Sequence, residues 1–192
     1  MGRSKATWVA LIRGIGPATH RKMSMQQLRD ACSAAGFEDV RTILATGNLL
    51  FSSSRPLREL REQLASVIAA HDLENVVFLR QSDDLEAVLR RRPFPDAASA
   101  RPNRLLVLFL EREPEPDAIA ALRGRAGPER IEAGDRELFI DFAEGVGGSK
   151  LTPAVIERHL GQPGTARNWN TVRKLLEASA PGRLEALGIE AP

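Results

Sequence analysis

The sequence predicts an α+β protein made of two ferredoxin-like halves of the βαββαβ type, in which helices cover one face of each antiparallel sheet. Short apolar runs bounded by turn residues alternate with segments of helical periodicity. In residues 1–92 the expected order is strand, helix, strand, strand, helix, strand. Residues 93–103 are rich in proline and lack periodicity, which predicts a linker, and the pattern begins again in residues 104–192.

The first strand is predicted at residues 8–12, a short apolar run that ends before Arg13 and Gly14. Apolar residues then recur at helical spacing between two positions that suit helix ends. Ser24 is a favourable N-cap residue, and Gly36 is typical of the residue that follows a helix. A strand leading into a helix is therefore expected at the start of the chain.

A hairpin, a second helix and a fourth strand complete the first half. Residues 40–45 and 49–53 are strand-like and flank Gly47 and Asn48, which tolerate the positive φ angles of a tight turn. We therefore expect these two runs to pair as antiparallel strands. Pro56 suits the first turn of the next helix. The last elements expected before the linker are a strand at residues 76–79 and a helix at residues 84–91.

The second half repeats the order of elements rather than the sequence itself. Thr152 and Pro153 supply the cap and first residue of one helix, which ends at Gly161. Residues 181–192 are expected to form a flexible tail. The expected elements are strands at residues 105–110, 130–133 and 137–142, and helices at residues 117–123, 153–161 and 169–179.

Composition excludes several classes of protein. With 43% hydrophobic and 27% charged residues, the chain is close to the globular average, so neither disorder nor a fibrous structure is expected. The single cysteine, Cys32, excludes an internal disulfide and predicts the cytoplasm as the compartment. Cys32 also lies on the apolar face of its helix, so we expect a buried thiol rather than a nucleophile. The apolar run at residues 8–12 is too short for a signal sequence or a membrane span, so no membrane partner is expected.

Charge and histidine spacing narrow the choice of ligand. The net charge is only +2 and acids are interleaved with bases, which weakens the case for a protein devoted to nucleic acid. The three histidines show no spacing typical of metal ligands, so neither a metal nor another cofactor is expected. No motif dictates a particular reaction, so the sequence leaves open whether the protein is an enzyme. It also leaves the oligomeric state open.

The densest polar motif is Thr165-Ala166-Arg167-Asn168-Trp169-Asn170-Thr171, which holds one of the two tryptophans. Trp169 shares a helical stripe with apolar residues that follow it, which favours core packing over base stacking. Asn168 and Asn170 both suit the N-cap of that helix. These structural roles leave Arg167 and Thr165 in an exposed turn without an explanation, so the turn is a candidate binding surface.

Three other segments carry polar residues at the ends of predicted elements. Residues 145–150 are rich in glycine and precede a helix, a position that favours an anion. They are not a P-loop, because Lys150 follows Ser149 in the wrong order, and a flexible turn is the alternative. Arg13 ends the first strand and is placed either in a cleft or in a surface ion pair. Asn48 is explained by the hairpin, although its amide is also a candidate ligand contact.

These segments together resemble the bacterial family called domain of unknown function 1697. The resemblance rests on four motifs in order, and it spans nearly the whole chain. It implies a cytoplasmic α+β protein with the doubled layout, and it implies no activity. One loop departs from the family pattern. Family members usually have an asparagine, a glycine pair and a lysine there, whereas this chain has Gly-Pro-Ala-Thr-His at residues 16–20. The motifs are Leu11-Ile12-Arg13-Gly14-Ile15, Thr46-Gly47-Asn48-Leu49-Leu50-Phe51, Ser149-Lys150-Leu151-Thr152 and Arg167-Asn168-Trp169-Asn170-Thr171-Val172.

The leading hypothesis is a protein that binds a small anionic ligand, phosphate-bearing or nucleotide-like, in a cleft between its halves. Cationic side chains would neutralise the anion, amides would orient it and Trp169 would offer an apolar face. One alternative is single-stranded nucleic-acid binding. Another is a structural or protein-interaction role in which no ligand is bound. The candidate ligand-binding residues are Arg13, Asn48, Lys150, Arg167, Asn168, Trp169 and Asn170.

Overall fold

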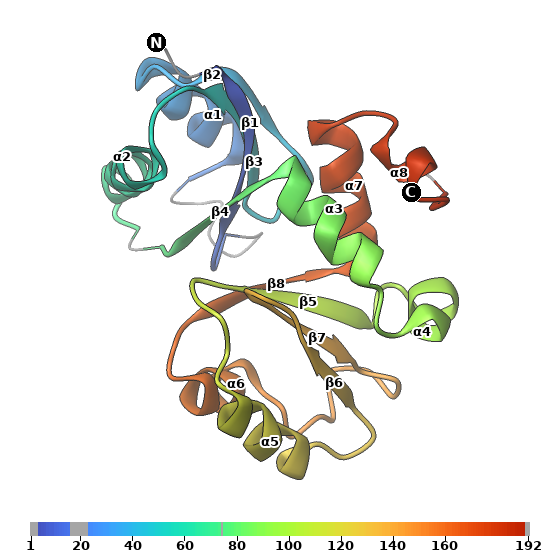
Figure 1. Cartoon of the computed structure of the whole chain (residues 1–192). Coiled ribbons are helices and arrows are strands. Elements are labelled where there is room, and N and C mark those ends of the chain that lie inside the picture. Colours follow the sequence, from blue (N-terminus) through green and yellow to red (C-terminus); the bar gives the residue numbers. More distant parts are fainter. Residues whose placement is uncertain (1–3, 16–22, 74, 191–192) are drawn as a thin grey trace. The chain divides into compact units, whose positions relative to one another are not determined.

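The structure is a computed structural model that describes residues 4–15, 23–73 and 75–190. The chain divides into two compact units, and each unit contains one four-stranded antiparallel sheet with helices packed against it (Figure 1). The α+β fold predicted from the sequence is thereby confirmed. The first unit comprises Met1–Leu85 and Leu175–Arg183, and the second comprises Glu86–Lys174 and Leu184–Pro192.

The first unit has the strand order β2-β3-β1-β4, which is the ferredoxin-like arrangement expected for two split βαβ motifs. The central strand β1 pairs antiparallel with β3 on one side and with β4 on the other. Its elements are β1 (Ala6–Ile12), α1 (Met25–Ala34), β2 (Glu38–Thr42), β3 (Asn48–Ser53), α2 (Leu57–Ala69) and β4 (Val77–Gln81).

Local signals in the sequence explain the first helix. The Ser24 side chain accepts a hydrogen bond from the backbone N–H of Gln27, and the Gln27 side chain accepts one from the backbone N–H of Ser24, which forms a capping box. Gly36 follows the helix at φ 83°. Leu28 and Cys32 face the sheet and are fully buried. The core of the unit lies between this face of the sheet and the helices α1 and α2.

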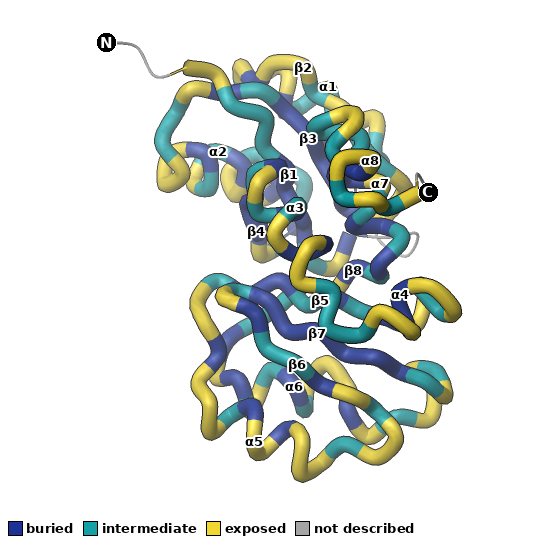
Figure 2. The backbone as a smooth tube through the Cα atoms, turned by 45° about the vertical axis from the view of Figure 1, so that its right-hand side comes forward, coloured by how far each residue is buried: buried dark blue, intermediate teal, exposed yellow. Residues whose placement is uncertain are grey.

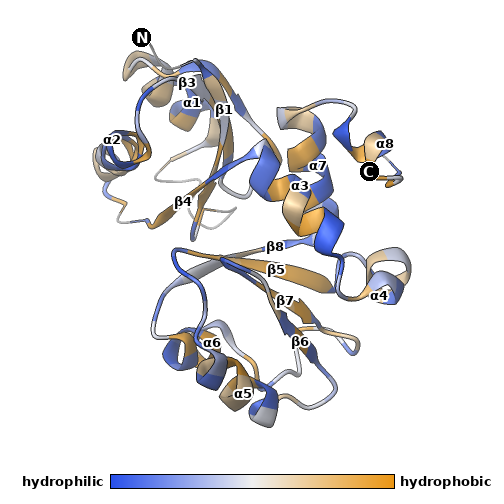
Figure 3. Ribbon diagram, in the orientation of Figure 1, coloured by the Kyte–Doolittle hydropathy of each residue, from blue (hydrophilic) through white to orange (hydrophobic). Residues whose placement is uncertain are grey.

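The second unit repeats the arrangement with the strand order β6-β7-β5-β8. Its central strand β5 is hydrophobic along its length (Figure 3), and both β5 and β7 are largely buried (Figure 2). Thr152 caps α6, Pro153 occupies its first turn and Gly161 ends it in the left-handed conformation, as predicted. The elements are β5 (Leu105–Leu110), α5 (Pro116–Arg125), β6 (Arg130–Ala133), β7 (Glu137–Asp141), α6 (Pro153–Leu160) and β8 (Gly164–Asn168).

Strand β8 was not predicted, and it replaces the exposed turn expected around Arg167. The segment Gly-Thr-Ala-Arg-Asn has no apolar alternation, but it pairs antiparallel with the apolar strand β5. Gly164 opens the strand close to β5, where a Cβ would lie 2.8 Å from the Leu108 side chain. Tertiary pairing, and not local propensity, therefore makes this segment a strand.

Further helices lie outside the two sheet motifs. α3 (Ser82–Arg91) and α7 (Trp169–Ser179) agree closely with the predicted helices, and the division between the units passes through both. The segment predicted as a linker contains α4 (Pro95–Ala100), and the predicted tail contains α8 (Arg183–Ala186), whose Leu184 is buried. The domain limits 1–92, 93–103 and 104–192 stay a prediction. No helix in the described part of the chain is long and apolar enough to cross a membrane.

Candidate functional site

Two of the predicted site residues, Arg13 and Asn48, lie in the first unit. Asn48 begins β3 and is fully buried. Its Nδ2 donates to the carbonyl of Ile43 at 2.9 Å and to Oγ1 of Thr46 at 3.1 Å. Gly47 adopts φ 68° in the same hairpin. The amide of Asn48 therefore closes the hairpin, which is the structural role expected from the sequence.

Arg13 follows β1 and is partly exposed. Its backbone N–H donates to the carbonyl of Val76 at 2.9 Å, and its carbonyl accepts a hydrogen bond from Nδ2 of Asn75. These bonds continue the pairing of β1 beyond its last residue. Gly14 follows at φ 74°. The residues of the family motif that depart from the usual pattern, 16–20, lie outside the described part of the chain.

The other predicted residues lie in the second unit, where Arg167 is a buried residue of β8. Its Nη1 donates to Oγ1 of Thr165 at 2.9 Å and to the carbonyl of Ala166 at 2.8 Å. Burial lowers the pKa of the Arg167 guanidinium to about 10, because the charged form is removed from water. Arg167 is thus held on its own strand rather than in an exposed turn.

Asn168 and Asn170 flank the start of α7 and have different roles. Oδ1 of Asn168 accepts the backbone N–H of Thr171 at 2.8 Å, which caps the helix as predicted. Nδ2 of Asn170 donates to Oδ1 of Asn103 at 2.9 Å, and Oδ1 of Asn170 accepts from Nη1 of Arg173 at 3.1 Å. Asn170 therefore connects the loop before β5 to an arginine one turn further along α7.

Lys150 is exposed in the loop before α6 and has no hydrogen bond or ion pair with the described residues. Its neighbours have structural roles. Leu151 is buried in the core of the second unit. Oγ1 of Thr152 accepts the backbone N–H of Val155 at 3.3 Å. Oγ of Ser149 accepts the backbone N–H of Leu151 at 3.0 Å. The motif thus anchors the start of α6 and leaves Lys150 in solvent.

Trp169 is only 2% exposed, so its ring packs in the protein, as the helical stripe predicted. Part of it also forms the wall of a hollow of about 370 Å³ in the second unit. We name this hollow the arginine hollow, because two of its lining residues are arginines. It is lined by Arg92, Ala98, Ser99, Pro102, Trp169, Arg173, Gly188, Ile189 and Glu190.

The guanidinium groups of the two arginines are fixed by hydrogen bonds from their Nη atoms. Nη2 of Arg92 donates to Oγ of Ser99 at 3.0 Å. Arg173 donates from Nη1 to Asn170 and from Nη2 to the carbonyl of Glu190. The Nε atom of each arginine is buried and has no hydrogen-bond partner in the described part of the chain. Arg92 also adopts φ 34°, a strained conformation for a residue other than glycine.

An unpaired buried donor is unfavourable, and a donor on a guanidinium is more unfavourable still. An anion in the arginine hollow would be attracted by the positive charges of both arginines. The hollow combines two cations, a hydroxyl and an aromatic wall with one carboxylate, that of Glu190, so its lining keeps a net positive charge. Cations and hydroxyls are the groups with which proteins bind small oxyanions.

A separate cluster of charges surrounds Asp141, whose side chain is fully buried at the end of β7. Arg101 and Arg130 both donate to its carboxylate, and both also donate to Asp96. Burial alone would raise the pKa of Asp141, but the hydrogen bonds and charges of the two arginines outweigh burial and lower it. Every cation of this cluster is paired with a carboxylate of the protein itself, so we assign it a structural role.

Comparison with known proteins places the chain in a family. It matches the family model described as "Protein of unknown function (DUF1697)" over residues 6–139, which is more than half of its length. The chain belongs to the DUF1697 family. The family predicted from the sequence motifs is thereby confirmed. No curated protein matches the chain.

A solved structure supports the fold of this DUF1697 protein. The conserved bacterial protein SP0830 from Streptococcus pneumoniae is similar with a TM-score of 0.67 and 23% sequence identity. The match covers 91% of this chain and 98% of the other. At this identity the likeness shows the fold alone, and it extends over both halves.

The residues predicted from the sequence do not include Arg92, Ser99 and Arg173, which together with Glu190 carry the polar side chains of the arginine hollow. One signal for Arg173 was available, because it follows Trp169 by four residues and so lies on the same side of α7. No comparable signal marks Arg92, which lies just after α3. Its place beside Arg173 depends on how distant segments of the second unit pack.

Proposed function

We propose that this DUF1697 protein binds a small anionic ligand in the arginine hollow of its second unit. The observation that carries the proposal is the pair of buried guanidinium Nε atoms without partners, on Arg92 and Arg173. A volume of about 370 Å³ is at the small end of ligand pockets, which supports a metabolite rather than a polymer. We also propose the cytoplasm as its compartment, supported by the free buried thiol of Cys32.

A phosphate-bearing ligand suits the chemistry of the hollow best. A guanidinium donates two parallel hydrogen bonds to an oxyanion, and Nε is one of the donors that it uses. The two guanidiniums outweigh the single carboxylate of Glu190, so the lining keeps a net positive charge that attracts a phosphate monoester. Trp169 supplies an apolar wall, but its 2% exposure leaves no open face for stacking a base. We therefore favour a small phosphorylated metabolite over a ligand that is recognised through its base.

Asn170 and Ser99 act in this proposal as positioning residues. Asn170 holds Arg173, and is itself held by Asn103, while Ser99 holds Arg92. Fixing each arginine before the ligand arrives reduces the conformational entropy lost on binding. The remaining predicted residues take no part in the hollow, and their contact with a ligand stays a prediction. They are Arg13, Asn48, Lys150, Arg167 and Asn168.

The test replaces each arginine with methionine, which keeps an unbranched, flexible side chain and removes the guanidinium and its charge. The probes are inorganic phosphate, glucose 6-phosphate and glucose, and binding is measured by isothermal titration calorimetry at constant ionic strength. We expect the two phosphates to bind and glucose not to bind. Arg92→Met and Arg173→Met should each weaken phosphate binding by about 10- to 150-fold, the range for a lost hydrogen bond to a charged group.

Neighbouring cations provide matched controls. Arg91→Met lies beside Arg92, and Lys174→Met lies beside Arg173, and both wild-type residues are exposed and do not line the hollow. Both controls should retain the wild-type affinity. The proposal is wrong if neither phosphate binds the wild-type protein, or if the control variants lose as much affinity as the hollow variants.

The alternative is a structural role without a ligand, and the hydrogen bonds of three predicted site residues favour it. Asn48 and Arg167 donate to neighbouring groups of their own hairpin and strand, and Asn168 caps a helix. Under this alternative these variants would lose stability while no phosphate bound. Single-stranded nucleic-acid binding stays a prediction. It would be recognised by an affinity that falls steeply with salt concentration.

A further inference from the structure

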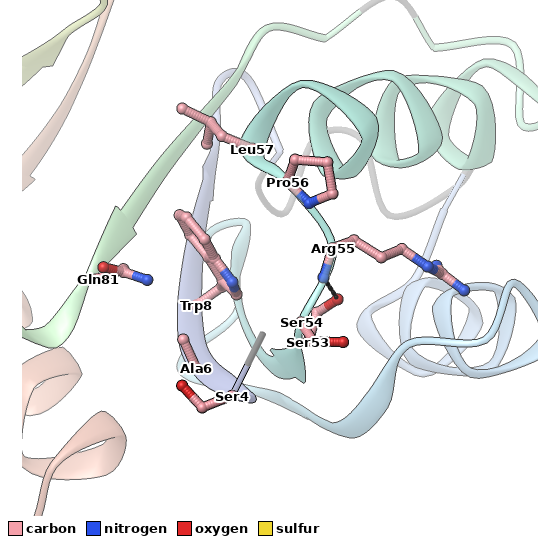
Figure 4. A pocket seen from close by; sticks show the side chains of 9 residues that line it. All are labelled: Ser4, Ala6, Trp8, Ser53, Ser54, Arg55, Pro56, Leu57 and Gln81. Atoms are coloured by element: carbon pink, nitrogen blue, oxygen red, sulfur yellow. Dashed lines mark hydrogen bonds between the residues drawn. The ribbon is translucent and has the colours of Figure 1, made fainter. Parts of the chain in front are cut away.

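A second hollow, of about 390 Å³, lies in the first unit and shares no residue with the arginine hollow (Figure 4). It is formed where the start of β1, the end of β3, the start of α2 and the end of β4 meet. We name it the Trp8 hollow. Its lining residues are Ser4, Ala6, Trp8, Ser53, Ser54, Arg55, Pro56, Leu57 and Gln81.

Trp8 brings an unpaired hydrogen-bond donor to this hollow. The Nε1 atom of its indole is buried and has no hydrogen-bond partner in the described part of the chain. Figure 4 shows the nitrogen on the side of the ring that faces the segment from Ser53 to Pro56. An indole N–H can only donate, and tryptophans that are buried usually have an acceptor for it. An acceptor atom from a ligand would satisfy this donor.

The wall opposite the indole is also rich in donors. Oγ of Ser53 accepts the backbone N–H of Arg55 at 3.1 Å, so its own hydrogen is directed elsewhere. Ser54 adds an exposed hydroxyl. Helix α2 then begins after Pro56, which provides no side-chain cap. The first N–H groups of the helix, beginning with that of Leu57, have no acceptor within the helix.

The charge of the hollow selects the type of anion. Figure 4 shows the Arg55 side chain extending away from the hollow, and its Nη1 donates to Oε1 of Gln63 while its guanidinium lies 5.9 Å from the centre of the Phe37 ring. Among the described residues, Arg55 is the one cation of the lining. No lining cation therefore faces the hollow to balance a dianion such as a phosphate monoester. Neutral donors and a helix N-terminus suit a single negative charge.

The rest of the lining is apolar and partly open to solvent. Leu57 is 38% exposed, and it lies at the hollow together with Ala6, Pro56 and the indole ring. A ligand that covered Leu57 would bury this apolar surface. The hollow thus presents donors on one side and an apolar surface on the other.

We propose that the Trp8 hollow binds a small monocarboxylic acid with an apolar body. One carboxylate oxygen accepts the indole N–H of Trp8, and the other accepts an N–H group at the start of α2. The hydrocarbon part lies against Leu57. This site is independent of the anion proposed for the second unit, because the two hollows have no lining residue in common.

The test follows the indole N–H of Trp8 by ¹H–¹⁵N NMR in the full chain. The chain has two tryptophans, so two indole signals are expected, and Trp169→Phe identifies the signal of Trp8. The probes are hexanoate, hexanamide and hexyl phosphate. We expect hexanoate to shift the Trp8 signal downfield in a saturable manner. Hexanamide, which lacks the charge, should bind at least about tenfold more weakly than hexanoate, as expected when a hydrogen bond to a charged group is lost.

Two leucine variants test the apolar part of the site. Leu57→Ala removes apolar surface from the hollow and should weaken hexanoate binding by about threefold or more. Leu44→Ala is the matched control, because Leu44 is 46% exposed in the same unit and does not line the hollow. It should leave binding unchanged. The proposal is overturned if no saturable shift occurs, if hexanamide or hexyl phosphate binds as tightly as hexanoate, or if both variants weaken binding equally.

Discussion

Replacing Asp141 with asparagine tests whether the charge cluster of the second unit stabilises the fold. Its carboxylate accepts four hydrogen bonds, two from Arg101 at 2.6 and 2.9 Å and two from Arg130 at 2.8 and 3.0 Å. Asparagine has the same shape, but it removes the negative charge and directs an NH₂ group at guanidinium donors. Two cations are then left without their buried partner.

The expected loss of stability follows from the exposure of each partner. Removing one member of a buried ion pair costs about 3–5 kcal/mol. The Asp141 side chain is fully buried, whereas the side chains of Arg101 and Arg130 are 28% and 42% exposed and keep their ion pairs with Asp96, so water and Asp96 still stabilise the two cations. We therefore expect a loss near the lower end, about 3 kcal/mol in the free energy of unfolding at pH 7. Asp135→Asn, in an exposed turn of the same unit, should change it by less than about 0.5 kcal/mol.

The effect of Asp141→Asn should also depend on pH. The pKa of Asp141 is lower in the folded protein than in the unfolded chain, where it is about 3.9. Its contribution is therefore complete above the unfolded pKa and is lost as the pH falls through the folded pKa. The difference between wild type and variant should be constant from about pH 7 to pH 5 and should narrow below about pH 4.

The assay is urea unfolding in a Trp8→Phe background, so that the emission of Trp169 reports on the second unit alone. Wild type, Asp141→Asn and Asp135→Asn are compared at each pH in this background. A loss below about 1 kcal/mol at pH 7 would show that the cluster is largely solvated and contributes little. A difference that persisted unchanged well below pH 4 would refute the assignment to the carboxylate charge.

Three further predictions concern single residues. Burial raises the pKa of the Cys32 thiol to about 12, so it should not react with a disulfide reagent at pH 8 until the protein is unfolded, when one equivalent should react. Gly47→Ala should lower the free energy of unfolding by more than about 1 kcal/mol, measured in urea, because Gly47 adopts φ 68° and a Cβ would lie 2.7 Å from the carbonyl oxygen of Ile12. Gly124→Ala should instead raise the midpoint of thermal unfolding, because this position in α5 is open and alanine favours a helix by about 1 kcal/mol.

The sequence predicted those parts of the fold whose signals are local. Ser24 and Gly36 mark the ends of α1, and Thr152 and Gly161 mark the ends of α6, because caps depend on a side chain and a backbone angle at one position. Strand β8 was not predicted, because its residues do not alternate between apolar and polar. It exists because the neighbouring strand β5 offers unpaired backbone groups.

The candidate site was harder to predict than the fold for the same reason. The arginine hollow draws its lining from four separate segments of the second unit, around Arg92, Ser99, Trp169 and Glu190. A linear motif can show that residues 165–171 are unusually polar, but it cannot show which distant side chains lie beside them. The Trp8 hollow escaped for a related reason, because an unpaired indole N–H is visible only once its surroundings are known.

The polar residues around Trp169 have two different roles, helix capping and the orientation of an arginine, which could not be distinguished from the sequence alone. Asn168 satisfies an N–H group at the start of α7, which any stable helix in this place would need. Asn170 donates to Asn103, as Asn168 also does, but its oxygen accepts from the guanidinium of Arg173 and not from the helix backbone. A cap does not require this second arrangement, whereas aiming a guanidinium does. The distinction between a binding protein and a purely structural one therefore depends on Arg173 and its held orientation, and not on Arg167, which is already engaged by its own strand.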